Sequence, residues 1–295
     1  MSCHLSIFGP IGLVGLGLVG KALARRLIGA GSRVVGRDPD QQARETARAI
    51  GVEIADDLPY VAECCKVIFL SLPDSVAVED VLWGTSSLSG SCTTGTLVLD
   101  TTTADPNETV RNFNRLATRQ IRFVDCPLVG SSQEIGEGQA VAIVGDQEET
   151  ADYAPLLRTF ANTVFFLGEV GRGHTAKLVV NLVLGLNRVV VSEGLGLAHR
   201  CNLDLAQMLT LMKASAAYSE VMDTQGGLML SRDFSRPTAR LAQHAKDVGL
   251  ILELAAESGA RVPMSKLHKL LLQEAIANDW GTLDNAAVFN LYVPP

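Results

Sequence analysis

The chain has 295 residues, of which 47% are hydrophobic and 19% charged, and its formal net charge is −7. This length allows about two domains, each large enough to bury a core of its own. Because nucleic acids and anionic membranes select a basic surface, the acidic balance argues against both as partners.

Six cysteines are spread along the chain, and none forms a Cys-x-x-Cys pair or lies at a spacing to histidine that suits zinc. We therefore expect a reduced intracellular protein without a metal site. The first residues, Met1–Leu5, lack a basic region followed by a long apolar segment. From this we expect no export signal and a cytoplasmic location.

Residues 11–38 carry the pattern of a dinucleotide-binding fold. An apolar run at Ile11–Val14 is followed by a glycine-rich turn, a helical stretch rich in Ala and Leu, a second apolar run at Val34–Val35, and Asp38. In such a fold the first glycine allows the tight turn, the second lets N–H groups approach a pyrophosphate, and the third lets the helix pack closely. We predict cofactor contacts from the whole turn, which comprises Gly15, Leu16, Gly17, Leu18, Val19 and Gly20.

Asp38 determines which cofactor we expect. It stands 18 residues after Gly20, at the end of the second apolar run, where a carboxylate can accept hydrogen bonds from both ribose hydroxyls of an adenosine. A carboxylate there repels the 2′-phosphate of NADP, whereas the neighbouring Arg37 could bind it. Because Asp38 occupies the recognising position, we expect NAD to be favoured over NADP.

Short apolar runs alternate with polar or helical segments up to Leu167, which predicts an α/β architecture with a wound parallel sheet of the Rossmann type. From Leu203 onward the pattern is helical throughout, which predicts an all-α C-terminal domain. Glycines punctuate the chain between the two patterns, so we place the dinucleotide-binding domain at 1–168 and the helical domain at 169–295. The runs that predict strands after the glycine-rich turn are 67–70, 97–99, 122–124, 140–144 and 164–167.

The most apolar stretch of the chain, Ala176–Ala198, predicts a long helix that joins the two domains. Polar and charged residues interrupt this stretch at short intervals, so we interpret it as a buried helix and expect no membrane partner. A helix this apolar needs neighbours on several sides, and a second copy of the chain would supply one. We therefore expect a homodimer or a homotetramer.

Lys177 and Asn181 are four residues apart and so lie one turn above each other on the long helix. Such a pair can hold one small substrate. A lysine that faces a cleft from an apolar helix can donate or accept a proton, because desolvation lowers its pKa toward neutrality. The alternative is a lysine whose stem is buried while its ammonium reaches water, with Asn181 merely satisfied in the core.

Four ordered segments together resemble the β-hydroxyacid dehydrogenase family, which includes 3-hydroxyisobutyrate dehydrogenases and the tartronate semialdehyde and glyoxylate/succinic semialdehyde reductases. The resemblance runs nearly from end to end. Further along, Lys246-Asp247 in a helix and Gly281–Asp284 also fit the family pattern. The four segments are the glycine turn with Leu72-Pro73, Asp100–Pro106, Asp125–Ser131 with Gly138, and Gly171–Lys177 followed by Asn181.

The resemblance implies an active-site cleft between the two domains and hydride transfer between a nicotinamide and a small hydroxy acid. It implies that Lys177 is the general acid/base, without a metal, and that Asn181 and the Gly130-Ser131 backbone hold a carboxylate substrate. The positions that it assigns to the cofactor, besides the glycine turn and Asp38, are Leu72, Pro73, Thr102 and Lys246. These roles agree with the chemistry, since a positioned ammonium can stabilise an alkoxide and then protonate it.

Structural alternatives exist for three of these positions. The Gly130-Ser131 pair could be a simple connecting turn. Thr102 could be an ordinary helix cap before Asp105, and Lys246 a solvated helix lysine. His174 lies one turn before Lys177 and could tune its charge, but a lone histidine at a helix start is more often structural, so we leave it outside the predicted site.

Two departures from the family pattern affect the substrate. Val129 stands where many members carry serine, so one hydroxyl expected at the substrate carboxylate is missing. Val180 replaces an asparagine that is common beside Asn181. The sequence therefore leaves open which hydroxy acid or semialdehyde is the substrate and in which direction the reaction runs. It also leaves open whether the oligomer is a dimer or a tetramer.

Two other functions fit the same scaffold. The first is an imine reductase, whose relatives typically replace the lysine with Asp or Tyr, so Lys177 counts against it. The second is a nucleotide-sensing or interaction protein that has lost catalysis, and the intact Lys177, Asn181 and Lys246 argue against that. The 6-phosphogluconate dehydrogenases share the fold, but the chain lacks their His-Asn pair after the lysine.

Overall fold

A computed structural model describes residues 8–294, so the expectation drawn from Met1–Leu5 lies outside the described residues. The chain divides into two compact units, Met1–Lys177 (unit 1) and Leu178–Pro295 (unit 2). The 1–168 and 169–295 division stays a prediction. The five cysteines in the described part are free thiols.

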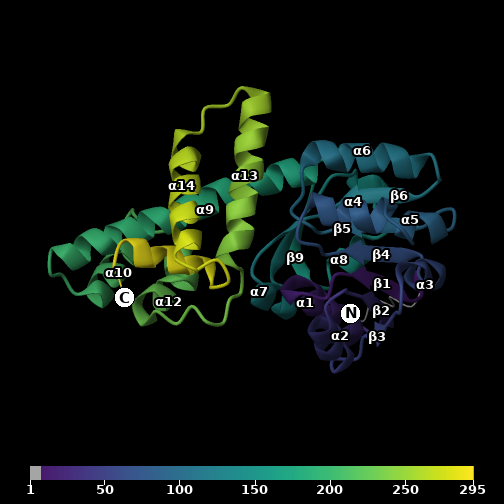
Figure 1. The fold of residues 1–295 in the computed structure, drawn as a ribbon, viewed down its shortest axis with the longest axis horizontal. Helices are drawn as coiled ribbons and strands as arrows, with labels where there is room; N and C mark the ends of the chain where they lie inside the picture. Colours follow the sequence, from purple (N-terminus) through teal and green to yellow (C-terminus); the bar gives the residue numbers. More distant parts are fainter. Residues whose placement is uncertain (1–7, 295) are drawn as a thin grey trace. The chain divides into compact units, whose positions relative to one another are not determined.

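Unit 1 contains a six-stranded parallel sheet with the strand order β3-β2-β1-β4-β5-β6 (Figure 1). This order, with a reversal of winding between β1 and β4, defines a doubly wound dinucleotide-binding sheet. The predicted fold class is therefore confirmed. The strands are β1 (Ile11–Val14), β2 (Val34–Arg37), β3 (Glu53–Ile54), β4 (Val67–Leu70), β5 (Leu97–Asp100) and β6 (Arg122–Asp125).

The strands of this sheet bury side chains on both faces. Along β4, Val67 and Phe69 belong to one hydrophobic cluster, whereas Ile68 and Leu70 belong to another. Successive residues of a strand point to opposite faces, so a sheet covered on both sides requires continuous apolar runs instead of alternating ones. This is why the strands could be recognised in the sequence.

Four of the five helices that directly follow strands of the six-stranded sheet begin at an aspartate whose carboxylate accepts backbone N–H groups of the first turn. The exception among these five is α1 (Leu18–Gly29), whose N-cap is Gly17 and which has no side-chain cap bond. The capped helices are α2 (Gln41–Arg48), α3 (Leu58–Cys64), α4 (Ser75–Trp83) and α6 (Pro106–Ala117), capped by Asp40, Asp57, Asp74 and Asp105. A short helix, α5 (Leu88–Ser91), lies between α4 and β5.

The sheet ends at β6, earlier than the pattern of apolar runs predicts. The last two runs form a separate three-stranded sheet, in which β7 (Leu128–Val129) pairs antiparallel with β8 (Ala140–Val144), and β8 pairs parallel with β9 (Ala161–Phe166). A buried strand of a small sheet has the same apolar composition as a strand of a large one, so composition alone could not separate them. Three short helices connect these strands: α7 (Ser132–Glu137), η2 (Glu148–Thr150) and α8 (Ala154–Leu157).

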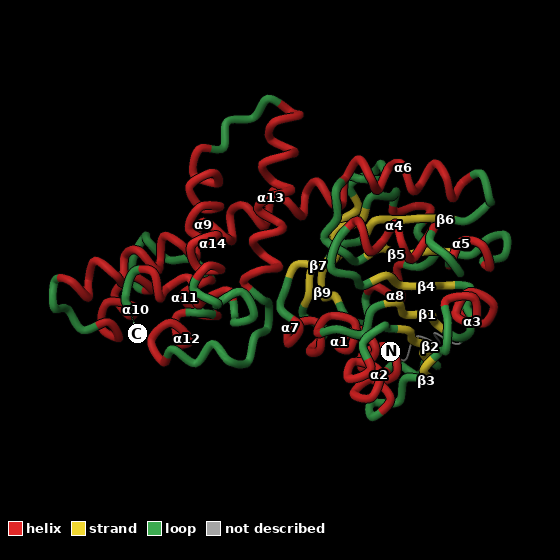
Figure 2. The backbone as a smooth tube through the Cα atoms, viewed as in Figure 1, coloured by secondary structure: helices red, strands yellow, loops and turns green. Residues whose placement is uncertain are grey.

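Unit 2 is helical, as predicted, and its described residues contain no strand beyond an isolated bridge between Arg240 and Asp284 (Figure 2). Helices α13 (Leu241–Ser258) and α14 (Pro263–Ala277) run side by side and share one hydrophobic cluster with the C-terminal 3₁₀ helix η3 (Asn285–Leu291). The remaining helices are α10 (Leu205–Lys213), α11 (Val221–Thr224) and α12 (Gly226–Ser231).

Helix α9 (Arg172–Arg200) begins in unit 1 and continues into unit 2. It confirms the predicted long helix, but it is less buried than expected: 44% of its most apolar 18-residue window is buried, and the helix is long and apolar enough to cross a membrane by length and composition. Val183, Val190 and Leu197 are each more than half exposed. Their seven-residue spacing places them on one face of the helix.

Candidate cofactor and active site

The strand ends of unit 1 form one row across the sheet. Residues Arg37, Val14, Leu70, Asp100 and Asp125 are register partners on β2, β1, β4, β5 and β6. Every predicted cofactor position of unit 1 follows a member of this row within a few residues. The structure therefore brings these positions to the carboxyl edge of the parallel sheet, where ligands bind in open α/β folds.

The glycine turn has the shape that its sequence predicts. Gly15 has φ +94°, and a Cβ on it would lie 2.1 Å from the Ser71 carbonyl oxygen. A Cβ on Gly20 would lie 2.0 Å from the Gly15 carbonyl oxygen, so the first turn of α1 packs directly on the loop. Gly17, in contrast, has no atom within 4 Å of a Cβ and is exposed. Its open surroundings and the uncapped start of α1 suit a diphosphate, which needs backbone N–H donors without an interposed side chain.

Asp38 is held against this turn. One carboxylate oxygen accepts the Leu16 N–H at 2.7 Å, and the other accepts the Asp40 N–H at 2.8 Å. Arg37 and Arg44 both donate to the Asp38 carbonyl oxygen, so their guanidinium groups are engaged with the backbone of this loop. The carboxylate is half-buried and retains acceptor capacity, because two oxygens offer about four lone-pair positions.

Thr102 links two of the predicted cofactor loops. Its hydroxyl accepts the Leu72 N–H at 3.1 Å, and its own N–H donates to Asp100 at 3.0 Å. The N-cap of the next helix is Asp105, so Thr102 is not the ordinary helix cap that its sequence also allowed. Thr102 joins the loop after β5 to the loop after β4, beside Leu72 and Pro73.

The Gly130-Ser131 turn is more constrained than its sequence indicates. Gly130 is exposed with φ +134°, which only glycine adopts easily. Ser131 caps α7 in a capping box: its hydroxyl accepts the Glu134 N–H at 3.2 Å, and its N–H donates to the Glu134 carboxylate at 2.6 Å. A substrate carboxylate at this N–H would therefore compete with Glu134.

Lys177 and Asn181 lie on consecutive turns of α9, and both are nearly buried, with 8% and 6% exposure. Asn181 donates its amide to Asp247 of α13 at 2.9 Å. Asp247 also pairs with the Lys246 ammonium at 2.8 Å, so Lys246, whose side chain is 25% exposed, is ion-paired to the carboxylate that holds Asn181. The amide of Asn181 is thus fixed in orientation by a buried carboxylate.

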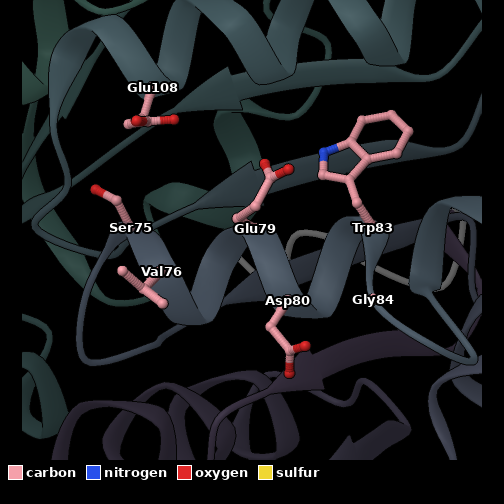
Figure 3. Close-up of a pocket in the computed structure, with 7 residues that line it drawn as sticks. All are labelled: Ser75, Val76, Glu79, Asp80, Trp83, Gly84 and Glu108. Carbon is pink, nitrogen blue, oxygen red and sulfur yellow. The ribbon is translucent and has the colours of Figure 1, made fainter.

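A cavity of about 420 Å³ in unit 1 contains none of these residues. It lies between α4 and the start of α6, where Figure 3 shows Glu79 and Glu108 on facing elements with Trp83 at one end. Three carboxylates line it, and Trp83 is covered by the Arg115 guanidinium at 3.8 Å from its ring. Carboxylate walls repel a diphosphate, so we do not assign the cofactor to this cavity.

Sequence reasoning missed the buried polar groups around the start of α9. Asp100 and Asp125 end two apolar strands, and each is fully buried. His174, which we left outside the site, is also fully buried. A signal existed for the two aspartates, since each closes an apolar strand run, but the contact of Asp125 with Gly171 joins residues 46 apart and needs the fold.

Comparisons with known proteins agree with this geometry. Residues 10–168 match the family model of the NAD binding domain of 6-phosphogluconate dehydrogenase. Residues 171–292 match the model described as NAD-binding of NADP-dependent 3-hydroxyisobutyrate dehydrogenase. The two models together span nearly the whole described chain.

Two curated relatives are similar over almost their full length. The 2-(hydroxymethyl)glutarate dehydrogenase of Eubacterium barkeri is 29% identical, with 96% of this chain and 94% of the relative covered. The 2-hydroxy-3-oxopropionate reductase of Escherichia coli K12 is 27% identical, with 94% and 95% covered. Among solved structures, the Mycobacterium tuberculosis 3-hydroxyisobutyrate dehydrogenase with L-serine has a TM-score of 0.84 at 24% identity, covering 96% of this chain and 99% of that one. At this identity the structural match supports the fold alone.

Proposed function

The chain belongs to the β-hydroxyacid dehydrogenase family, and on this basis we propose that it interconverts a small β-hydroxy acid, or another short hydroxy acid, and its semialdehyde or keto form, with Lys177 as general acid/base. Membership establishes an NAD(P)-binding oxidoreductase. The substrate, the lysine mechanism and the preferred cofactor are the proposed part.

The observation that carries the proposal is the placement of Lys177 directly below Asn181 on α9. Both side chains are nearly buried, and the Asn181 amide is held by Asp247. In surroundings as buried as these, the attraction between an ammonium and a substrate oxygen beside it is stronger than in water. A lysine and an amide one turn apart on a helix can therefore both contact the oxygen-bearing end of one substrate.

The nicotinamide, when bound, donates or accepts the hydride at the substrate carbon. The chain's own residues supply the rest. In the reducing direction the Lys177 ammonium stabilises negative charge on the substrate oxygen and donates the proton that completes the hydroxyl, and in the oxidising direction the neutral amine removes it. Asn181 would orient that oxygen. Thr102 and Lys246, which the family pattern assigns to the cofactor, would hold its nicotinamide end when it is bound.

The substrate is proposed to carry a carboxylate. The names of both curated relatives denote small carboxylic acids with a hydroxyl or oxo group near the carboxyl. Gly130 and Ser131 would bind this carboxylate through N–H groups, with Glu134 released from the Ser131 N–H. Val129 contributes no hydroxyl here, so carboxylate binding relies on the backbone more than it would with serine.

NAD is the proposed cofactor, in preference to NADP. Asp38 is fixed beside the glycine turn by the Leu16 N–H, and a carboxylate in this place repels a 2′-phosphate. The neighbouring guanidinium groups of Arg37 and Arg44 are both directed to the backbone of the same loop. NADH and NADPH titrated into the protein would measure the preference directly.

We also propose a homodimer or homotetramer built through α9. Its exposed stripe of Val183, Val190 and Leu197 leaves apolar surface in water, which a second copy would cover. Val190→Glu should shift the protein to the monomer in sedimentation velocity. Val76→Glu, at an even more exposed valine of α4, is the matched control. A monomeric wild type at micromolar concentration would contradict this proposal.

The decisive experiment is a panel of small semialdehydes with NADH or NADPH, and of hydroxy acids with NAD or NADP, on wild type and Lys177→Ala. General acid/base catalysis contributes about 10²- to 10⁴-fold, so kcat/KM should fall by that factor while calorimetric NADH affinity stays unchanged. Lys213→Ala, which removes a half-exposed lysine of α10, is the matched control and should keep full activity. Equal activity in wild type and Lys177→Ala would contradict the assignment.

A further inference from the structure

The loop that follows β2 keeps its charged groups apart from one another. The Asp38 carboxylate accepts the N–H groups of Leu16, at 2.7 Å, and Asp40, at 2.8 Å. The Asp40 carboxylate caps α2, where it accepts the Gln42 N–H at 3.1 Å and the Ala43 N–H at 3.2 Å. All four carboxylate oxygens of this loop therefore already accept backbone donors.

Two guanidinium groups converge on the same loop from different elements. Arg37, the last residue of β2, donates Nη1 to the Asp38 carbonyl oxygen. Arg44 of α2 donates Nη1 to the same carbonyl at 2.8 Å and to the Pro39 carbonyl at 2.7 Å. Both arginines are half-buried. One carbonyl oxygen thus holds two cations together.

Neither of these two cations is neutralised by an ion pair. None of the ion pairs among residues 8–294 includes Arg37 or Arg44. Two guanidinium groups at one carbonyl repel each other, and the carbonyl dipole offsets only part of their charge. A guanidinium binds most strongly to an oxyanion that it can meet with two parallel N–H groups. The pair therefore has the chemistry of an oxyanion-binding site.

Asp38 places this pair at the adenosine end of the proposed cofactor site. Its carboxylate is fixed against the glycine turn by the Leu16 N–H, in the place where an adenosine ribose is recognised. The 2′-phosphate that distinguishes NADP from NAD is attached to one of the two ribose hydroxyls. Because the carbonyl and the carboxylate belong to one residue, both guanidinium groups are neighbours of the group that would meet this phosphate.

We propose that Arg37 and Arg44 form a phosphate-binding site that the Asp38 carboxylate blocks. The inference rests on the proposed function in that the end of β2 is taken to bind the adenosine of the cofactor. With Asp38 charged, a 2′-phosphate meets a like charge, and NAD is preferred. Without that charge, the guanidinium groups can leave the loop carbonyls and bind the phosphate. The preference for NAD therefore depends on one carboxylate in a loop that otherwise suits NADP.

Calorimetric binding tests the proposal without turnover. The ligands are NADPH and 2′,5′-ADP, with NADH and 5′-AMP as the matched ligands that lack the 2′-phosphate. Asp38→Asn removes the charge and keeps the shape of the side chain, and its amide oxygen can still accept the Leu16 N–H. A hydrogen bond to a charged group is worth about 10-fold or more in affinity, so NADPH and 2′,5′-ADP should bind Asp38→Asn at least about 10-fold more tightly than wild type. Unchanged affinity for both ligands would overturn the proposal.

Arg44→Gln in the Asp38→Asn background shows whether Arg44 supplies the new affinity. Glutamine can still donate to the loop carbonyls but carries no charge. NADPH and 2′,5′-ADP should lose about 10-fold, whereas NADH and 5′-AMP should keep the affinity that they have for Asp38→Asn, which also reports that the site remains folded. Full NADPH affinity in this double variant would overturn the role of Arg44.

Arg48→Gln, in the same Asp38→Asn background, is the matched control. Arg48 is an exposed arginine one turn further along α2, so its loss changes the net charge equally and should leave all four affinities unchanged. An equal loss of NADPH affinity in the Arg44 and Arg48 variants would assign the effect to net charge and overturn the proposal. Wild type that binds NADPH as tightly as NADH would also overturn it, because Asp38 would then block nothing. Failure of the proposed function shows separately, as equal activity of wild type and Lys177→Ala.

Discussion

Each unit buries an ionisable side chain, but the hydrogen-bond partners available to that side chain differ between the two units. In unit 1, Asp125 lies where a strand ends and a helix begins, and two backbone N–H groups reach its carboxylate. In unit 2, Arg188 lies in the middle of α9 with 2% exposure, its Nε donates to Gln225 at 2.6 Å, and its Nη1 has no hydrogen-bond partner among the described residues. Burial lowers the pKa of Arg188 to about 10, against the charge of Asp284.

The difference follows from where free backbone groups occur. Helix ends and strand ends offer unpaired N–H and C=O groups, whereas the middle of a helix uses all of its own. A charge buried at the carboxyl edge of a sheet is therefore compensated by the backbone, and a charge buried mid-helix depends on side chains. Around Arg188 the nearest titratable side chains include His268, which is neutral at physiological pH because burial, and then Arg188, lower its pKa to about 4.

The largest expected effect is at the compensated site. Asp125→Ala leaves two buried N–H groups without partners, each costing about 1–3 kcal/mol, so unit 1 should lose about 4 kcal/mol of unfolding free energy. Hydrogen exchange at the start of α9 measures this locally. Asp57→Ala removes a surface cap with one bond to Tyr60, at 2.9 Å, and should cost about 1 kcal/mol. Equal losses in the two variants would remove the distinction between buried and surface caps.

The next effect is at the uncompensated site and depends on pH. The folded-state pKa of His268 is about 4, below its unfolded value of 6.5, so the unfolded chain binds a proton first as the pH falls. Stability is therefore fully present above pH 6.5 and is lost on acidification toward pH 4, by about 3 kcal/mol at 1.36 kcal/mol per unit. The unfolding free energy of His268→Gln, measured by urea titration at each pH, should fall less steeply on acidification over this pH range than that of the wild type. An unchanged dependence of the unfolding free energy on pH would assign the acid-induced loss of stability to other groups.

A third prediction concerns the uncapped start of α1, where Gly17 and Gly20 differ in the space around them. Gly17→Ala adds a methyl group that meets no atom of the protein, so stability should be unchanged while NADH affinity falls about 10-fold, or about 1.4 kcal/mol. Gly20→Ala is the matched variant, and its methyl group meets the Gly15 carbonyl, so it should destabilise the fold. Full NADH affinity in Gly17→Ala would move the diphosphate away from this turn.

The smallest effect is expected at the surface capping box. Glu134→Gln keeps the reciprocal hydrogen bonds of the box and removes one negative charge beside the proposed carboxylate site. Removing a half-buried like charge near the surface is worth up to about 1 kcal/mol, so KM for the carboxylate substrate should fall by up to about 5-fold with kcat unchanged. Glu137→Gln, on the same short helix, controls for the change in net charge. A raised KM would place the substrate carboxylate elsewhere.

The sequence predicted the features that depend on local pattern. The glycine turn, Asp38 and the strands from Val67 to Val124 follow from periodicity and spacing, because a sheet buried on both faces imposes its composition on each strand. The extent of the first sheet could not be predicted, since the Ala140–Val144 strand pairs with β7 and β9, and its apolar composition does not distinguish these partners from β6. The surroundings of Lys177 could not be predicted either. Asp100, Asp125 and His174 come from three distant segments, and only the fold brings the two aspartates into register and the His174 N–H onto Asp125.

The continuous hydrogen bonding of α9 has a further consequence for the two residues proposed to grip the substrate. Lys177 closes one compact unit and Asn181 belongs to the other, yet four residues of helix separate them, a rise of about 6 Å. That spacing is fixed by the geometry of the helix itself. As long as the helix stays intact, a rearrangement elsewhere in the protein leaves this backbone spacing between the two residues unchanged.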